Sequence, residues 1–207
     1  FTPVANFNGI ATAVNYTVND DDGLTSNIAT ITVTVTNVND APIANNDSIS
    51  TAEETPVSLT VTTNDTDVDG TIDVATVDLD PATTGIKTTF TVDNEGTYTV
   101  DNSGVVTFTP VANFNGIATA VNYTVNDNDG VTSNIATITV TVTNVNDAPI
   151  ANNDGISTLE ETPVSLTVTT NDTDVDGTID VATVDLDPAT AGLQTTFTVA
   201  NEGTNTV

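Results

Sequence analysis

The chain has 207 residues, of which 29 are acidic and one, Lys87, is basic, so its formal net charge at pH 7 is −28. Binding to nucleic acid or to an anionic membrane surface needs clustered Lys and Arg side chains, so this charge excludes both partners. Cys and His are absent, which removes the usual ligands of zinc and copper and leaves a hard divalent cation as the natural complement of the charge.

The sequence repeats itself. The segment FTPVANFNGIATAVNYTVND begins at Phe1 and again at Phe108, an offset of 107 residues, and such self-similarity is typical of arrays of structural repeats. The aligned segments 1–100 and 108–207 differ at Asp21/Asn128, Leu24/Val131, Ser48/Gly155, Ala52/Leu159, Thr84/Ala191, Ile86/Leu193, Lys87/Gln194, Asp93/Ala200 and Tyr98/Asn205.

The repeat predicts a division into domains. The segment NVNDAPIANND, at Asn37–Asp47 and Asn144–Asp154, is expected to be a linker because it is rich in Asn, Asp and Pro. We therefore predict one complete domain over 41–147. Residues 1–40 are expected to be the C-terminal strands of a preceding repeat, and 148–207 the N-terminal strands of a following one. An alternative is a polymer in which the C-terminal half-domain of one chain completes the N-terminal half-domain of the next.

Alternating apolar and polar residues predict strands throughout the chain. In Ile10–Val18 the residues expected to share one face are Ile10, Val14, Tyr16 and Val18; in Ile28–Val38 they are Ala29, Ile31, Val33 and Val35. Within the complete domain we expect strands near 47–51, 56–63, 72–79, 86–92, 96–100, 104–109, 117–126 and 135–144. Seven or eight short strands without a helical period indicate an all-β, immunoglobulin-like β-sandwich. Its core is expected to contain small aliphatic residues capped by Phe90, Phe108, Phe114 and Tyr123.

Acidic residues gather in a short loop after the second of these strands. Asp65, Asp67 and Asp69, followed by Gly70, form the D-x-D-x-D-G pattern of a calcium-binding loop, in which alternate side chains surround the ion and the glycine allows a sharp turn. An EF-hand would have Glu at the position of Thr76, so the remaining ligands must come from elsewhere. The second copy contains the same pattern at Asp172, Asp174 and Asp176.

Three further clusters supply candidate ligands. They lie in the hairpin before the last strand, in the two linkers, and in a glutamate pair ahead of a strand. The candidates are Asp127 and Asp129; Asn37, Asn39, Asp40, Asn144, Asn146 and Asp147; and Glu53 and Glu54.

The sequence resembles cadherins at several of these places. The segment VTVTNVNDAP resembles the linker between cadherin domains, AEETPVSLTV resembles their opening strand, and DTDVDG resembles their acidic loop. The whole pattern is most similar to the bacterial cadherin-like tandem repeats of giant surface proteins.

This resemblance implies calcium ions between successive domains. At the first junction Asn37, Asn39 and Asp40 would meet Asp67, Asp69 and either Asp127 or Asp129. At the second, Glu53 or Glu54 would join Asn144, Asn146 and Asp147, with Asp174 and Asp176 completing the site.

The predicted function is that of a calcium-stiffened extender repeat of an extracellular adhesin or filament on a bacterial surface, with a role in cell adhesion. Its partners would be neighbouring repeats of the same array, and either identical chains in a filament or cell-surface glycans. Direct insertion into a membrane is not expected. An enzyme is not expected, because the carboxylates recur once per repeat whereas a catalytic site is usually single. One alternative is a carbohydrate- or surface-binding module that uses the outward threonine rows Thr30, Thr32, Thr34, Thr36 and Thr137, Thr139, Thr141, Thr143.

Overall fold

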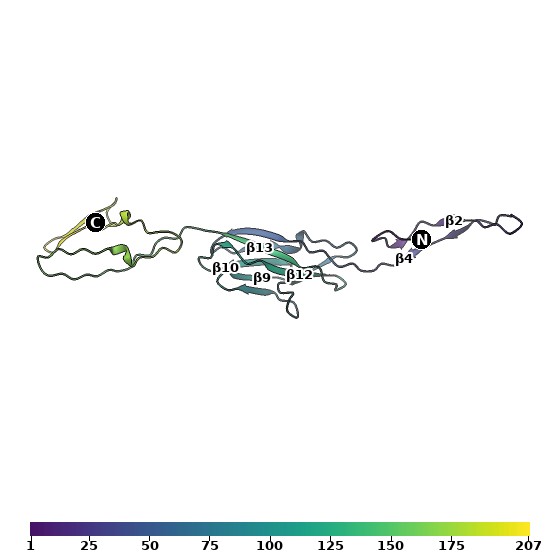
Figure 1. Cartoon of the computed structure of the whole chain (residues 1–207), viewed down its shortest axis with the longest axis horizontal. Coiled ribbons are helices and arrows are strands. Elements are labelled where there is room, and N and C mark those ends of the chain that lie inside the picture. The colour runs from purple at the N-terminus through teal and green to yellow at the C-terminus, as the bar shows by residue number, and fades with distance from the viewer. The chain divides into compact units, whose positions relative to one another are not determined.

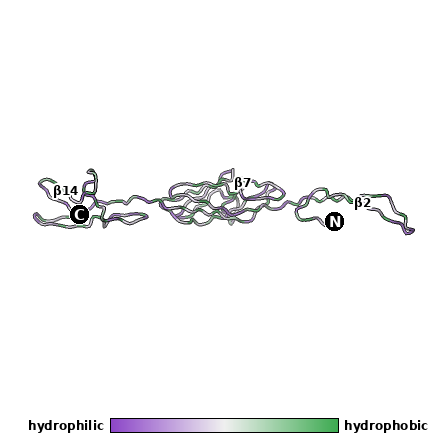
Figure 2. Tube along the Cα trace, turned by 90° about the horizontal axis from the view of Figure 1, so that it is seen from above, coloured by the Kyte–Doolittle hydropathy of each residue, from purple (hydrophilic) through white to green (hydrophobic).

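The structure, a computed structural model, describes residues 1–207 and divides into two compact units, Phe1–Thr143 and Asn144–Val207. Both units are built from β-strands and a few single-turn 3₁₀ helices. No helix is long and apolar enough to cross a membrane. Figure 2 shows hydrophobic and hydrophilic residues interleaved along the chain trace, as expected for strands with one buried face.

The first unit contains a β-sandwich (Figure 1). Its elements are β5 (Asp47–Ala52), β6 (Val57–Thr60), η1 (Val61–Thr63), β7 (Ile72–Asp78), β8 (Thr89–Val92), β9 (Gly96–Val100), β10 (Val105–Pro110), β11 (Gly116–Ile117), β12 (Val121–Asp127) and β13 (Ala136–Thr143). One sheet has the order β6-β10-β9-β8. The other has the order β11-β13-β12-β7, with β5 pairing to β13. The all-β sandwich predicted from the alternating pattern is therefore confirmed.

The pairing of β5 with β13 is parallel, whereas the other strand pairs are antiparallel. Its register joins Ile138 to Asp47 and Thr143 to Ala52. The chain therefore enters the sandwich beside the start of β13 and leaves it at the end of β13. Segments that precede and follow the sandwich are consequently attached at opposite ends of this strand.

The core lies between the two sheets. β13 buries alternate residues, Ala136, Ile138, Val140 and Val142, each with at most 2% of its surface exposed, as predicted from the same alternation. The opposite sheet contributes the fully buried side chains of Tyr98, Val106 and Phe108, and the neighbouring strand β12 contributes Val121, Tyr123 and Val125. Tyr98, whose ring centroid lies 4.6 Å from that of Phe108, was not among the predicted core aromatics.

The predicted strand 117–126 is interrupted. Ile117 is 72% exposed, whereas its neighbour Ala118 is 2% exposed and Val121 is 1% exposed. The break between β11 and β12 shifts the alternation by one residue, since faces alternate only along a continuous extended backbone. The counterparts of Ile117 and Ala118 in residues 1–40 show the same difference, since Ile10 is 72% exposed and Ala11 is 8% exposed. In the complete repeat Ile117 and Val121, the counterparts of Ile10 and Val14, therefore do not share a face, so the alternation predicted for Ile10–Val18 does not hold there.

Residues 1–40 form two small two-stranded sheets. Their strands are β1 (Gly9–Ile10), β2 (Val14–Tyr16), β3 (Ala29–Ile31) and β4 (Thr34–Val35), with β1 paired to β4 and β2 paired to β3. This segment repeats the sequence of residues 108–147. Its apolar side chains are largely exposed.

The second unit contains η2 (Val168–Thr170), η3 (Val181–Thr183) and a hairpin of β14 (Thr196–Val199) with β15 (Gly203–Thr206). The hairpin corresponds to β8 and β9 of the sandwich. Where the sandwich has β7, this unit has the turn η3.

Candidate functional site

The acidic loop between η1 and β7 is closed by Asp67. Its Oδ1 accepts hydrogen bonds from the backbone N–H groups of Asp69 (3.1 Å) and Gly70 (2.9 Å). The other oxygen, Oδ2, is buried and has no hydrogen-bond partner. A buried carboxylate oxygen without a partner loses hydration with no compensating bond, so this atom is suited to accept a proton donor or a cation.

The linker lies against this loop in the first unit. The side-chain amide of Asn37 donates to Asp69 Oδ2 at 2.8 Å, and the backbone N–H of Asp40 donates to Asp69 Oδ1 at 3.2 Å. Two groups of the linker are thus bound by one carboxylate of the following repeat.

The hairpin between β12 and β13 holds the linker at a second point. Asn39 donates from its side-chain amide to Asp127 Oδ2 at 2.6 Å. Asp127 Oδ1 accepts the backbone N–H groups of Asp129 (2.9 Å) and Val131 (2.8 Å). Burial opposes the ionisation of Asp127, but these hydrogen bonds together lower its pKa. Asp127 therefore stays charged although its surface is only 2% exposed.

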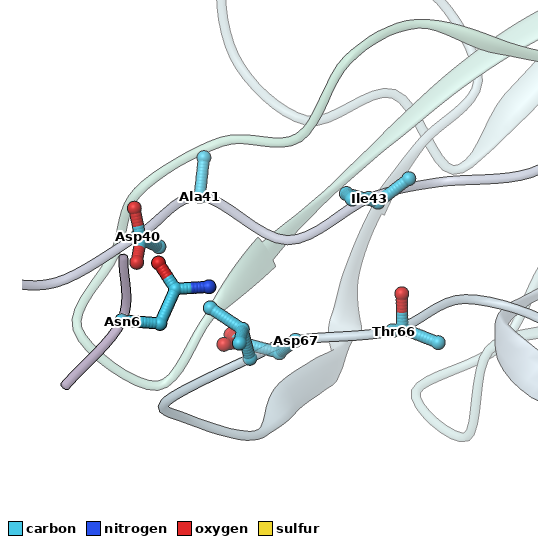
Figure 3. Close-up of a pocket in the computed structure, with 7 residues that line it drawn as sticks. Asn6, Asp40, Ala41, Ile43, Thr66 and Asp67 are labelled. Atoms are coloured by element: carbon cyan, nitrogen blue, oxygen red, sulfur yellow. The ribbon is translucent and has the colours of Figure 1, made fainter. Parts of the chain in front are cut away.

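A pocket beside the linker contains a residue that the sequence analysis did not identify. It is lined by Asn6, Asp40, Ala41, Ile43, Thr66, Asp67 and Val68. Figure 3 shows the side chain of Asn6 next to those of Asp40 and Asp67. Asn6 has a positive φ of 58°, a conformation that Asn tolerates better than most residues. The N-x-N-G segment around it was a visible turn signal, but nothing in it pointed to the linker.

Gly70 leaves space between two polar side chains of the site. A Cβ atom at this position would lie 2.7 Å from Asn128 Oδ1 and 3.1 Å from Asp67 Oδ2. Asn128 Oδ1 is already fixed, because it accepts the backbone N–H of Thr71 at 2.7 Å. The loop and the hairpin can approach each other here only because residue 70 has no side chain.

Replacing Gly70 with alanine should therefore separate the loop from the hairpin. We expect Gly70→Ala to lower the free energy of unfolding by about 1–3 kcal/mol, the usual cost of overpacking, as measured by urea denaturation. Gly155→Ala is the control, because a Cβ atom there meets nothing within 4 Å. Equal stability of Gly70→Ala and the unmodified chain would contradict this role.

Asp65, although part of the same acidic pattern, lies in the sandwich interior. Its surface is 9% exposed, and its Oδ1 accepts the backbone N–H of Asn45 at 2.8 Å. The hydroxyl of Tyr123 lies 3.0 Å from Asp65 Oδ1 and 3.2 Å from Asp47 Oδ2. It also lies 2.8 Å from the carbonyl oxygen of Asn45. A hydroxyl has one proton to donate, so Tyr123 cannot satisfy all of these acceptors at once.

This crowding of oxygens affects ionisation. Burial raises the pKa of Asp47 from 3.8 to about 6, with the hydrogen bond to Tyr123 opposing the shift and the charge of Asp65 adding to it. Burial also raises the pKa of Asp65, against its hydrogen bonds to Asn45 and Tyr123. The folded chain therefore holds the proton of Asp47 to a higher pH than the unfolded chain does.

The pH dependence of stability should reveal this carboxyl. The pKa of Asp47 is higher in the folded state than in the unfolded state. Protonation of Asp47 therefore adds to the free energy of unfolding, fully below about pH 4, and this contribution is lost as the pH rises through about 6. We expect Asp47→Asn to become more stable relative to the unmodified chain between pH 4 and pH 7, as measured by urea denaturation with chelator present. Asp154→Asn, which changes the exposed counterpart in the second copy, is the control. A stability difference between Asp47→Asn and the unmodified chain that is constant with pH would contradict the assignment.

The second unit repeats the linker contacts. Asn144 donates to Asp176 Oδ2 at 2.7 Å, and the backbone N–H of Asp147 donates to Asp176 Oδ1 at 3.2 Å. The hydrogen bond from Asn144 is the main reason why the pKa of Asp176 is lowered. Asp174 closes the loop as Asp67 does, accepting the N–H of Gly177 at 2.8 Å.

The remaining candidate ligands have other surroundings. Asp172 accepts the backbone N–H of Asn152 at 2.7 Å, as Asp65 does in the first copy. Asn146 donates to the carbonyl oxygen of Asp147 at 3.0 Å. Asp129 is exposed and accepts a hydrogen bond from Asn128 at 3.2 Å. In the glutamate pair, Glu53 is 5% exposed, while Glu54 is exposed and has a positive φ of 58°.

No three acidic side chains of residues 1–207 come together as a metal-binding group. The donors nevertheless suit a hard cation. They are carboxylate and amide oxygens, which calcium prefers, and Asp67 keeps one buried oxygen without a partner. Asp67, Asp69 and Asp127, with the linker residues Asn39 and Asp40, are the residues that could hold such an ion at the first junction.

The fold and this site define an all-β protein in which an acidic linker binds to loops of the domain that follows it. The profile of the bacterial cadherin-like domain matches residues 39–144, and that of the bacterial Ig domain matches residues 146–207. The chain belongs to the bacterial cadherin-like domain family, as the sequence resemblance predicted. Domains of this kind are structural and adhesive modules rather than typical enzymes, and cadherin-like domains generally bind calcium.

Among solved structures the chain is similar to the crystal structure of chicken VE-cadherin EC1-2, with 22% sequence identity and a TM-score of 0.32. The match covers 59% of this chain and 61% of that chain. No curated protein matches the sequence.

Proposed function

We propose that the chain is a calcium-stiffened extender segment of an extracellular bacterial adhesin or surface filament. It would hold an adhesive region away from the cell. Its direct partners would be neighbouring repeats of the same array, and the stiffness would come from the acidic linkers.

The binding of the linker to the following repeat is the observation that carries this proposal. In the first unit the linker donates to Asp69 at 2.8 Å and to Asp127 at 2.6 Å. Equivalent hydrogen bonds join Asn144 and Asp147 to Asp176 in the second. The contacts use the residue types found in calcium sites, and those made to Asp69 recur at Asp176 in the second copy.

The charge of the chain explains why these hydrogen bonds would not be enough. With a formal net charge of −28, successive repeats repel each other at low ionic strength. The Asp67 carboxylate has a buried oxygen without a hydrogen-bond partner, and burying this oxygen beside the linker also costs free energy. When bound, a divalent cation would neutralise this charge, while Asp69 and Asp127 keep the linker in place.

Calorimetric melting and X-ray scattering of the 207-residue chain, each with calcium and with chelator, test the proposal. We expect calcium to raise the melting temperature and to increase the maximum dimension of the chain. Magnesium should have a smaller effect, because it keeps several of its own water ligands. If calcium changes neither stability nor dimensions, the acidic loops are solvated turns and the proposal fails.

A further inference from the structure

The complete sandwich has a second pocket, which contains no residue of the linker. Its volume is about 360 Å³, within the range of pockets that bind small ligands. Five of the residues that line it are polar: Thr76 and Asp78 of β7, Thr124 and Asn126 of β12, and Thr132 of the hairpin that follows β12. None of the five is a candidate calcium ligand, and none belongs to the outward threonine row of β13.

Thr124 brings an unpaired hydroxyl group to this pocket. Its neighbours Tyr123 and Val125 are fully buried in the core, so Thr124 points to the opposite, outer face of the sheet. Only 7% of Thr124 is exposed, yet its hydroxyl forms no hydrogen bond within the chain. Buried hydroxyl groups are normally hydrogen-bonded, so this one is available to a ligand.

The polar groups beside Thr124 each have one fixed and one free hydrogen-bonding atom. Asp78 Oδ1 accepts the backbone N–H groups of Asp80 (3.0 Å) and Lys87 (2.9 Å), while Oδ2 accepts no hydrogen bond from the chain. The hydroxyl of Thr132 donates to Asn126 Oδ1 at 2.8 Å, which leaves the amide nitrogen Nδ2 as a free donor. The pocket thus offers an acceptor, a donor, and a hydroxyl that can act as either.

Apolar side chains form the rim of the pocket. Pro81 and Ile86 come from the loop between β7 and β8, and Ile135 lies just before β13. Ile86 is 49% exposed and Ile135 is 59% exposed. The loop is held in place by its hydrogen bonds to Asp78 and by the backbone N–H of Leu79, which donates to the carbonyl oxygen of Lys87 at 2.9 Å. The pocket is therefore formed before any ligand binds.

A neutral sugar residue has the chemistry that complements this pocket. Its hydroxyl groups donate and accept hydrogen bonds, and the C–H groups of its ring form an apolar face. The net charge of −28 disfavours anionic ligands such as phosphates, sulfates and uronates. A metal ion needs more oxygen ligands than the single carboxylate of the pocket supplies. No aromatic side chain lines the pocket, so the sugar ring would lie against aliphatic side chains and bind weakly.

The rim of the pocket is also where the two copies of the repeat differ most. Three of the nine differences between them fall within four consecutive residues, at Thr84/Ala191, Ile86/Leu193 and Lys87/Gln194. The counterparts of the five polar lining residues are unchanged, namely Thr17, Asn19, Thr25, Thr183 and Asp185. This pattern fits a binding site whose polar groups fix the class of ligand while the rim adjusts the preference.

We propose that this pocket binds a neutral pyranose residue of a glycan, which makes the repeat a weak carbohydrate-binding module as well as an extender. Asp78 Oδ2 accepts a hydrogen bond from one sugar hydroxyl, and Asn126 Nδ2 donates to another. The hydroxyl of Thr124 binds between them, and the sugar ring lies against Ile86 and Ile135. This function goes beyond the proposed extender role, because no calcium ligand takes part in it.

Titration of the isotope-labelled full chain with the methyl pyranosides of glucose, galactose and mannose, followed by heteronuclear NMR, tests the proposal. We expect at least one glycoside to shift the amide signals of Ile86, Thr124 and Asn126 and to reach saturation. Thr124→Val keeps the shape of the side chain and should weaken binding about tenfold, the value of one hydrogen bond. Thr109→Val is the matched control, because Thr109 is an exposed threonine of β10 whose hydroxyl forms no hydrogen bond.

Binding should be the same with calcium and with chelator, since no residue of this pocket is a candidate metal ligand. This comparison separates the pocket from the calcium proposal, which can fail while the sugar still binds. The inference is overturned if none of the three glycosides shifts these signals at its solubility limit. It is also overturned if Thr109→Val weakens binding as much as Thr124→Val, if glucuronic acid binds as well as the neutral glycosides, or if chelator abolishes binding.

Discussion

Calcium at a hundredfold excess over its dissociation constant for the site at the first junction should stabilise the first unit by about 2.7 kcal/mol, and Asp67→Asn with Asp69→Asn should abolish this effect. The size follows from binding to the folded state alone. Asp67 supplies the buried oxygen without a partner, and Asp69 accepts two hydrogen bonds from the linker. Replacing both with asparagine removes two charges while keeping the size of the side chains. The free energy of unfolding should be measured by urea denaturation with calcium and with chelator.

The control for this pair is Asp21→Asn with Asp93→Asn. It also removes two carboxylates, but at positions where the other copy has Asn128 and Ala200. The calcium effect should persist in the control. If both double variants lose the effect equally, calcium acts only through the overall charge of the chain.

Tyr98→Asn should destabilise the central sandwich by about 3–5 kcal/mol, the range observed when a large buried aromatic side chain is truncated. Tyr98 is fully buried, and its ring centroid is 4.6 Å from that of Phe108. The substitution also places an amide in an apolar environment, which adds the cost of desolvating it. The second copy already has asparagine at this position, Asn205, where it is exposed. Urea denaturation of the full chain, followed by the fluorescence of the remaining tyrosines, measures the loss.

Tyr98→Phe separates packing from hydrogen bonding. The hydroxyl of Tyr98 makes one long contact, 3.4 Å to the carbonyl oxygen of Thr119. We therefore expect Tyr98→Phe to cost about 1 kcal/mol or less, the usual net value of a single hydrogen bond. A Tyr98→Asn variant that is as stable as Tyr98→Phe would show that this part of the core tolerates an unfilled volume.

Much of the fold could be predicted because the pattern of the sequence has the same period as the structure. The strand predicted at 135–144 is β13 (Ala136–Thr143), with the predicted face buried. Strands were also predicted correctly at 72–79 and 96–100, where β7 and β9 lie. Alternation fixes which side chains share a face for as long as the backbone stays extended. It could not locate the break after Ile117, because Ile-Ala-Thr-Ala reads equally well as a continuous strand.

The candidate site was only partly predictable, since residues in one short motif can face different environments. Asp65 and Asp67 lie two residues apart, yet Asp65 points into the sandwich toward Tyr123 and Asp67 closes the loop beside the linker. The cadherin resemblance placed Asn37 and Asp69 around one calcium ion, and the structure joins them by a direct hydrogen bond. Asn6 was not, because its proximity to Asp40 and Asp67 depends on how the preceding segment folds back.

The sequence alone determined the charge, the repeat, the strand pattern and the chemical class of the candidate ligands, because each of these depends on residue type and spacing. Tertiary structure decided which carboxylates are buried, which bind the linker, and which apolar side chains enter the core. Those properties depend on the neighbours that surround each side chain. Ile117 and Ala118 are adjacent in the sequence, yet 72% of Ile117 and 2% of Ala118 is exposed, because the strand breaks between β11 and β12.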